Sequence, residues 1–409
     1  DNPIMETPHT MSAEAPGSCV VEDDTSQYPS ATHDAPSFAG LTDLAAEKYG
    51  SKILFATDEW FAVAENLFKG EPVFDPNAFT EFGKEMDGWE SRRRRTQGHD
   101  WCIIELGLPG YIVGVDIDTA NFTGNFAPGA SVQAMCFAPG EAPTPAALKR
   151  PNGGVMGTHA TVEQTAEALK LNSDKWTTIV PPTRLASGAA GTRHSYVPVS
   201  SQERWTHLRL NQFPDGGIAR LRVYGRPDVL NPSTDAEGLV ELSAAVNGGQ
   251  QVCFSDSHYG RPSNLIAPDQ AVNMGDGWET SRRMDRPAVF TKDAAGVPQM
   301  RGNEWCILQL GKAGQARRLT LDSLWFKGNY PESVAVEGIN APTLGLDAAA
   351  LTKASGWFTL LPRTPGWPNA PRDFTKDQGL VVDKDITHIR VTIFPDGGLA
   401  RLRLWGVPA

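Results

Sequence analysis

The feature that most constrains this chain is that its second half repeats its first. Residues 206–225 read THLRLNQFPDGGIARLRVYG and residues 387–406 read THIRVTIFPDGGLARLRLWG, which are identical at 13 of 20 aligned positions. Self-similarity over such a length indicates a duplicated structural unit. Both copies are therefore expected to adopt the same fold, with matching residues in matching places.

Further blocks recur in the same order, so the duplication covers a whole domain. The matching pairs are Asp58 with Asp256, Asn66-Leu67 with Asn264-Leu265, the Asp-Gly-Trp-Glu block 87–90 with 276–279, the Trp-Cys-Ile block 101–103 with 305–307, and Gly124-Asn125 with Gly328-Asn329. The second copy is shorter before its Asp-Gly-Trp-Glu block and carries extra residues around 293–300. Length changes of this kind are typical of surface loops.

The repeat boundaries predict the domain organisation. A chain of 409 residues exceeds the size of one ordinary core. We predict a first repeat over residues 41–227, a linker over 228–240 and a second repeat over 241–409. Residues 1–40 are rich in Pro, Ser, Asp and Thr and lack apolar periodicity, which predicts a flexible N-terminal arm.

Short alternating runs bounded by Gly and Pro predict an all-β fold, with two tandem β-sandwich domains. Strands are expected at 101–106 and 112–117 and at the equivalent positions of the second copy. The Phe213-Pro-Asp-Gly-Gly turn predicts a hairpin between the strands on either side of it. Helix is expected only in minor pieces, at 41–49, 160–171 and 234–245.

Charge and composition argue against several classes of partner. The net charge of −11 and pI of about 5.3 disfavour nucleic acid and anionic membranes as partners. The sequence has no apolar run long enough to span a bilayer and no secretion signal, which predicts a cytoplasmic protein, with the peroxisome as an alternative. The five cysteines show no paired metal-ligand spacing, so we expect reduced thiols that are mostly buried.

The order of the blocks within each repeat resembles the jelly-roll domains of the discoidin and galactose-binding class. More specific stretches are LFATDEWFAVAENL at 54–67, MDGWESRRR at 86–94, GHDWCII at 98–104, GDGWETSRR at 275–283 and EWC at 304–306. They resemble the allantoicase family, which has two such domains. The resemblance covers residues 41 to 409.

This resemblance implies hydrolysis of allantoate to ureidoglycolate and urea, within purine catabolism, by a homo-oligomeric enzyme. Allantoate carries one carboxylate and two ureido groups on a single sp3 carbon. Its site therefore requires a cation and several planar hydrogen-bond partners. Loss of urea requires an acid to protonate the departing nitrogen and a base to activate water.

Carboxylates and a histidine in the repeated blocks are the candidate acids and bases. They are Glu90, His99, Asp100, Glu279 and Glu304. A carboxyl in a partly dry pocket has a raised pKa and can act as the acid. The competing interpretation is structural: Glu90 and Glu279 form ion pairs that brace their loops, and His99, which has Asn303 as its counterpart, is an ordinary loop residue.

Arginines, tryptophans and asparagines supply the candidate substrate contacts. They are Trp89, Arg93, Arg94, Asn125, Trp278, Arg282, Arg283 and Asn329. A guanidinium holds a carboxylate in bidentate fashion, the indoles provide flat walls, and the amides reach the rim of the pocket. Each also has a structural alternative, as a surface ion pair, a core side chain or a turn residue.

No cofactor is evident, and no metal ligands are assigned. The eight histidines are scattered without ligand spacing, so a structural zinc centre is not predicted. A divalent ion held by carboxylates from separate loops remains compatible with the sequence. Two rival functions stay open: a non-catalytic tandem module that binds glycans or other small molecules, and a ureide hydrolase with another substrate.

Overall fold

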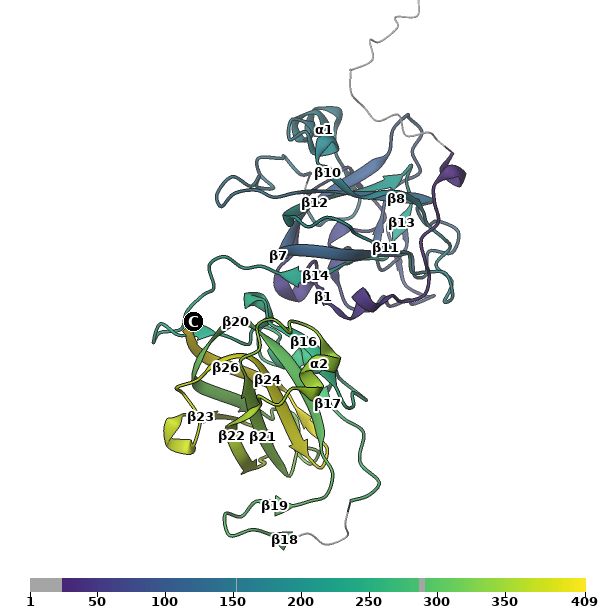
Figure 1. The fold of residues 1–409 in the computed structure, drawn as a ribbon. Coiled ribbons are helices and arrows are strands. Elements are labelled where there is room, and N and C mark those ends of the chain that lie inside the picture. The colour runs from purple at the N-terminus through teal and green to yellow at the C-terminus, as the bar shows by residue number, and fades with distance from the viewer. Residues whose placement is uncertain (1–23, 152, 287–290) are drawn as a thin grey trace, which may run out of the picture.

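A computed structural model describes residues 24–151, 153–286 and 291–409. It contains two lobes, each organised around an eight-stranded set of antiparallel strands (Figure 1). This arrangement confirms the predicted all-β fold with two tandem sandwiches.

One long strand organises each repeat. In the first repeat this strand is β7 (Asp100–Asp118). Its first part pairs with β2 (Lys52–Ala56) and β12 (Arg204–Phe213), and its second part pairs with β11 (Tyr196–Pro198) and β14 (Arg220–Pro227). β7 therefore contributes to both layers of the sandwich. The separate strands predicted at 101–106 and 112–117 are two parts of this one strand.

The remaining core strands extend the two layers. β8 (Gly129–Met135) pairs with β12 and with β10 (Thr177–Arg184), whereas β1 (Thr42–Asp43) pairs with β14. Two-residue strands form three separate pairs outside these layers: β3 (Asp58–Glu59) with β9 (Thr158–His159), β4 (Phe79–Thr80) with β5 (Gly83–Lys84), and β6 (Trp89–Glu90) with β13 (Gly217–Ile218).

The second repeat reproduces this topology around β20 (Glu304–Asp322). Its other core strands are β15 (Val240–Glu241), β16 (Gln250–Phe254), β21 (Ser333–Ile339), β22 (Phe358–Pro365), β23 (Pro371–Phe374), β24 (Asp385–Phe394) and β26 (Arg401–Pro408). The short strands are β17 (Trp278–Glu279), β18 (Thr291–Lys292), β19 (Pro298–Gln299) and β25 (Gly398–Leu399). Apolar side chains that alternate along these strands fill a separate core in each repeat.

The repeated Pro-Asp-Gly-Gly segment is a turn, but the hairpin prediction is wrong. β12 and β14 both pair with β7 rather than with each other, so the turn connects the two layers of the sandwich. Gly216 and Gly397 have φ of 125° and 128°, which L side chains rarely adopt. A Cβ atom on Gly217 would lie 2.0 Å from the Phe122 ring, so this position also requires glycine.

Helix is a minor component, as expected, but only one of the three predicted helices forms. α1 (Val162–Leu169) lies within the predicted 160–171 segment and has a capping box from Thr161. Segment 41–49 contains β1 and a 3-10 turn, and segment 234–245 contains β15 and ends where a 3-10 turn begins, so these two predictions of α-helix are wrong. α2 (Ala348–Lys353) was not predicted.

The N-terminal segment departs from the prediction of a flexible arm over 1–40. Residues 1–23 lie outside the described part of the chain, but residues 24–40 pack on the first repeat. Thr32 forms a β-bridge with Tyr196, and the Phe38 ring lies 6.3 Å from the Tyr196 ring. The arm prediction is therefore wrong for 24–40, because its few aromatic side chains find apolar partners on the sandwich.

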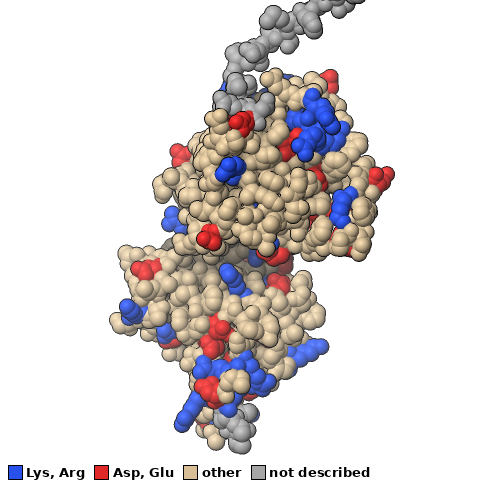
Figure 2. Space-filling model, turned by 90° about the vertical axis from the view of Figure 1, so that its right-hand side faces the viewer, with Lys and Arg blue, Asp and Glu red and all other residues tan. Residues whose placement is uncertain are grey.

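The surface carries both signs of charge on both lobes. In the view of Figure 2, one group of basic side chains lies on the upper lobe, and mixed acidic and basic side chains gather at the lower tip. Of the cysteines in the described residues, Cys102 and Cys306 are buried free thiols, Cys253 is half-buried and Cys136 is exposed. Within the same residues, no helix has the combination of length and apolar composition that crossing a bilayer requires.

Candidate active site

The Trp-Glu pair of each repeat forms a short strand at the side of the sandwich. β6 pairs with β13, and β17 pairs with β25 in the second repeat. Successive side chains of a strand point to opposite faces. Trp89 is fully buried and donates from Nε1 to the Asp58 carbonyl oxygen at 2.8 Å; Trp278 donates in the same way to Asp256 at 3.0 Å. Both indoles belong to the core, so their prediction as substrate contacts is wrong.

The glutamate beside each tryptophan pairs with an asparagine from the loop after the long strand. Asn125 Nδ2 donates to Glu90 Oε1 at 2.6 Å, and Asn329 Nδ2 donates to Glu279 Oε1 at 2.5 Å. The backbone holds both loops in place, because the carbonyl oxygen of Asn125 accepts from Gly217 and that of Asn329 accepts from Gly398. The structure thus brings together two pairs of sequence candidates that lie 35 and 50 positions apart.

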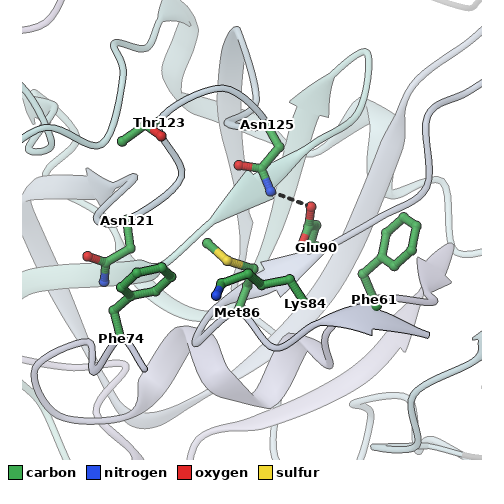
Figure 3. A pocket seen from close by; sticks show the side chains of 9 residues that line it. Phe61, Phe74, Lys84, Met86, Glu90, Asn121, Thr123 and Asn125 are labelled. Carbon is green, nitrogen blue, oxygen red and sulfur yellow. Dashed lines mark hydrogen bonds between the residues drawn. The ribbon is translucent and has the colours of Figure 1, made fainter. Parts of the chain in front are cut away.

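In the first repeat the Glu90–Asn125 pair lies in a pocket of about 340 Å³ (Figure 3). Aromatic and aliphatic groups form part of its wall, and three further polar side chains, Lys84, Asn121 and Thr123, face it. The lining residues are Phe61, Phe74, Gly83, Lys84, Met86, Glu90, Asn121, Thr123 and Asn125. This combination of apolar walls and a few convergent polar groups is typical of a small-molecule site.

The Glu90 carboxyl is buried without a compensating cation. Its residue is only 8% exposed, and none of the described side chains forms an ion pair with it. Burial raises the pKa of Glu90 to about 7, against a smaller opposing effect of the Asn125 hydrogen bond. Glu90 therefore exchanges a proton near neutral pH, as a catalytic acid or base does. The alternative interpretation, an ion pair that braces the loop, does not apply to Glu90.

A second group of candidates forms ion pairs away from this pocket. Arg94 Nη1 donates to Asp100 Oδ1 and Arg283 Nη1 donates to Glu304 Oε1, both at 2.8 Å. The backbone N–H of Arg94 also donates to Asp215 at 2.8 Å. These pairs brace the segment that follows each Trp-Glu strand. None of Arg94, Asp100 and Arg93 lines the Glu90 pocket.

The neighbouring arginines are open to solvent. The Arg93 side chain is 69% exposed, and its Nε lies 3.7 Å from Asp215 Oδ1. Arg282 is exposed and lines a shallow hollow of about 450 Å³ in the second repeat, together with Arg283 and Glu304. That hollow also contains Asp256 and Asp285, and the Arg283 guanidinium already pairs there with Asp285 and Glu304.

His99 lies with the bracing group rather than in the pocket. Its Nε2 is 3.0 Å from Asn211 Oδ1, and its ring lies edge-on to Phe213 with centroids 4.7 Å apart. Burial lowers the pKa of His99 to about 4, despite the opposing contact with Asn211. The imidazole is neutral at pH 7 and serves as a packing group here.

Sequence reasoning missed most of the pocket wall. Phe74, Lys84, Asn121 and Thr123 have no matching residue type in the second repeat, so comparison of the repeats gave no signal for them. Phe61 is matched only by another aromatic residue, Tyr259. The available signal was the extra length before the first Asp-Gly-Trp-Glu block. That extra segment carries Phe74 and Lys84.

Metal-binding side chains do not cluster in the part of the chain that the structure describes. No three His, Cys, Asp or Glu side chains in these ranges lie close enough to hold one ion. The Glu90 pocket itself contains a single carboxylate.

Fold and site together define a protein of two tandem β-sandwich domains, each with a carboxyl–amide pair beside a loop, and with a pocket built around the first pair. A family model described as "Allantoicase repeat" matches residues 42–228 and 240–409 of this chain. The chain belongs to the allantoicase family.

Named relatives agree with this assignment. A probable allantoicase 2 of Burkholderia pseudomallei is 40% identical over 376 residues, which cover 91% of this chain and 97% of the relative. A probable allantoicase of Pseudomonas savastanoi pv. phaseolicola is 39% identical, with 91% and 98% covered. The crystal structure of allantoicase from Saccharomyces cerevisiae is 28% identical, with a TM-score of 0.64 over 90% of this chain and 93% of that one.

Proposed function

We propose that this protein hydrolyses allantoate to ureidoglycolate and urea, and that the Glu90 pocket of the first repeat is the site of reaction. Family membership supports the reaction, since relatives that match nearly the whole chain are named allantoicases. The observation that supports the location is Glu90, a buried carboxyl with a pKa of about 7 that lies in a pocket of about 340 Å³.

The chemistry requires one proton donor and one proton acceptor. Water adds an oxygen to the central carbon, the bond from this carbon to one ureido nitrogen breaks, and the departing nitrogen takes up a proton to give urea. Glu90 in its protonated form donates this proton, and the carboxylate that results accepts the proton lost by the attacking water. The remaining ureido nitrogen stabilises the positive charge that develops on the carbon.

Asn125 holds the Glu90 carboxyl in place, because its amide donates to Oε1 at 2.6 Å. Asn121 and Thr123 supply further hydrogen-bond partners that suit planar ureido groups. Phe61 and Phe74 form apolar walls that keep part of the pocket dry and so maintain the raised pKa of Glu90.

The decisive experiment replaces Glu90 by Gln and measures urea release from allantoate by the full-length protein. Gln keeps the acceptor for Asn125 but cannot carry a titrating proton. We expect kcat to fall by about 10²- to 10⁴-fold, the usual contribution of a positioned acid or base. Glu203→Gln, on an exposed loop position, is the matched control and should keep wild-type activity.

Two results would contradict the proposal in different ways. If Glu90→Gln keeps full activity, the reaction takes place elsewhere on the chain. If the wild-type protein binds sugars on a glycan array and releases no urea from allantoate, the non-catalytic binding module is correct. Competition between allantoate, allantoin and ureidoglycolate separates the proposed substrate from related ureides.

We propose that no cofactor is needed, which predicts full activity after dialysis against a chelator. A homo-oligomer is also proposed, and light scattering tests it; exposed apolar side chains near the pocket, such as Val73 and Phe79, are candidates for burial between copies. A cytoplasmic rather than peroxisomal location requires cell fractionation.

A further inference from the structure

We propose that Lys84 binds the carboxylate of the substrate and so determines that the pocket accepts an anionic ureide. This inference deepens the proposed function and rests on it. The second repeat has no lysine at the corresponding position.

The Lys84 ammonium group is positioned by aromatic rings and not by an acid. Its Nζ lies 4.9 Å from the centroid of Phe74 and 4.8 Å from that of Phe79, and it donates to the Pro76 carbonyl oxygen. None of the carboxylates in the described ranges forms an ion pair with it. An ammonium group has three donors, so two remain for a ligand.

The place of Lys84 within the pocket suits a substrate with a charged end. Lys84 is half-buried and lines the same pocket as Glu90. In Figure 3 its side chain extends past Met86 toward Phe74 and Asn121, whereas Glu90 and Asn125 face one another on the other side of the view. A ligand can therefore place its carboxylate at Lys84 and a ureido group beside Glu90.

Two aspects of the environment strengthen an ion pair at this position. Aromatic rings limit the hydration of the ammonium group, so attraction to a carboxylate is screened less than at an open surface. The Pro76 carbonyl and the two rings also restrict the side chain in advance, which reduces the entropy lost when a ligand binds.

The second repeat provides an internal comparison. The segment between Asn264 and Asp276 is nine residues shorter than that between Asn66 and Asp87. The second repeat therefore lacks counterparts of Phe74 and Lys84. Trp325 stands at the position of Asn121 there, and its Nε1 donates to the Ala271 carbonyl oxygen at 2.7 Å. The Glu279–Asn329 pair is thus retained with a different wall.

The test compares Lys84→Met, Lys84→Arg and the control Lys353→Met, an exposed lysine of α2, in the full-length protein. Urea release from allantoate is measured as a function of substrate concentration. We expect KM for Lys84→Met to rise about 10- to 100-fold, the usual effect of losing one charged hydrogen bond, with kcat within about threefold of wild type. Lys84→Arg should recover part of the affinity.

A neutral substrate analogue separates recognition of charge from a structural effect. Wild type should prefer allantoate over its methyl ester by a large factor in kcat/KM, and Lys84→Met should reduce that preference by at least tenfold. A Lys84→Met variant with the KM of wild type, or with equal losses on the acid and the ester, overturns the inference.

The outcomes also distinguish this inference from the proposed function. If wild type releases urea but Lys84→Met binds allantoate normally, only the role of Lys84 fails. If wild type releases no urea, the proposed function fails, and calorimetric titration with allantoate still tests Lys84 as an anion-binding residue: loss of binding in Lys84→Met supports it, and unchanged binding overturns it.

Discussion

At the scale of single residues, Glu90 is a carboxyl that the fold keeps buried without a cation, although this lowers stability. A buried carboxylate without a cation is costly, so the side chain retains its proton to a higher pH than in the unfolded chain. The pKa of Glu90 is about 7 in the folded protein, compared with an ordinary value of 4.5. Folding stability must depend on pH as a consequence.

The sign of this dependence follows from proton uptake. Between pH 4.5 and pH 7 the folded protein holds the Glu90 proton more firmly than the unfolded chain does, so the contribution of Glu90 to stability falls as pH rises through this window. Glu90→Gln removes this effect while keeping an acceptor for Asn125. We expect the variant to match wild type near pH 4 and to be more stable at pH 8, by on the order of 1–3 kcal/mol.

Urea unfolding at both pH values measures this difference. Glu203→Gln serves again as the control, because an exposed carboxyl has little effect on stability at either pH. A stability difference between Glu90→Gln and wild type that is the same at pH 4 and pH 8 would show that Glu90 has an ordinary pKa.

At the scale of elements, buried arginines on the closing strand fix the loops that carry the site. Arg220, at the start of β14, is 1% exposed and donates from Nη2 to Asp87 Oδ2 at 2.7 Å. Asp87 also accepts from the backbone N–H of Val73 at 2.8 Å. The second repeat has the same contact, from Arg401 to Asp276 at 2.8 Å. We call this Arg–Asp contact the clamp. It ties the core of each repeat to the segment before the Trp-Glu strand.

We expect Asp87→Asn to destabilise the first repeat by about 3 kcal/mol, because it leaves the Arg220 charge buried without its acid. Since Asp87 also holds Val73, the pocket wall should loosen and KM for allantoate should rise. Denaturant unfolding and steady-state kinetics measure the two effects. Asp34→Asn, at an exposed position, is the control, and a stability equal to that of this control would mean that the clamp is unimportant.

The elements also show what the sequence could and could not predict. The aligned Ala-Arg-Leu-Arg segments placed Arg220 and Arg401 in matching strands, but their partners Asp87 and Asp276 are more than 120 positions away along the chain. Strand pairing is nonlocal, so the sequence predicted the turn at Phe213 but not that β12 and β14 pair with β7. Local signals sufficed for α1, whose capping box lies within its own sequence.

The site was predictable to the extent that it is duplicated. Glu90 and Asn125 were found because Glu279 and Asn329 recur at matching positions. Trp89 recurs for another reason, since it fills the core, and recurrence alone does not distinguish a core residue from a ligand contact. Lys84 and Phe74 lie in a segment without a counterpart, so only the three-dimensional structure relates them to Glu90.

At the scale of the whole molecule, the two repeats touch, but the proposed site belongs to the first repeat alone. Tyr49 of the first repeat packs against both cores, and Gln250 Nε2 donates to the Gly225 carbonyl oxygen at 3.2 Å. The linker is held to the second repeat by an ion pair between Arg318 and Asp235 at 2.7 Å. The pocket around Glu90 is lined by residues of the first repeat alone.

This arrangement predicts that the copies contribute unequally to activity. Glu279 keeps its asparagine partner, but its surroundings lack the segment that carries Lys84 and Phe74. We expect Glu279→Gln to retain more than half of the wild-type kcat/KM for allantoate, whereas Glu90→Gln loses at least about 100-fold. Urea release by the two single variants and the double variant measures this. Equal losses in both single variants would instead mean that both repeats take part in catalysis, and a large loss in Glu279→Gln alone would move the reaction to the second repeat.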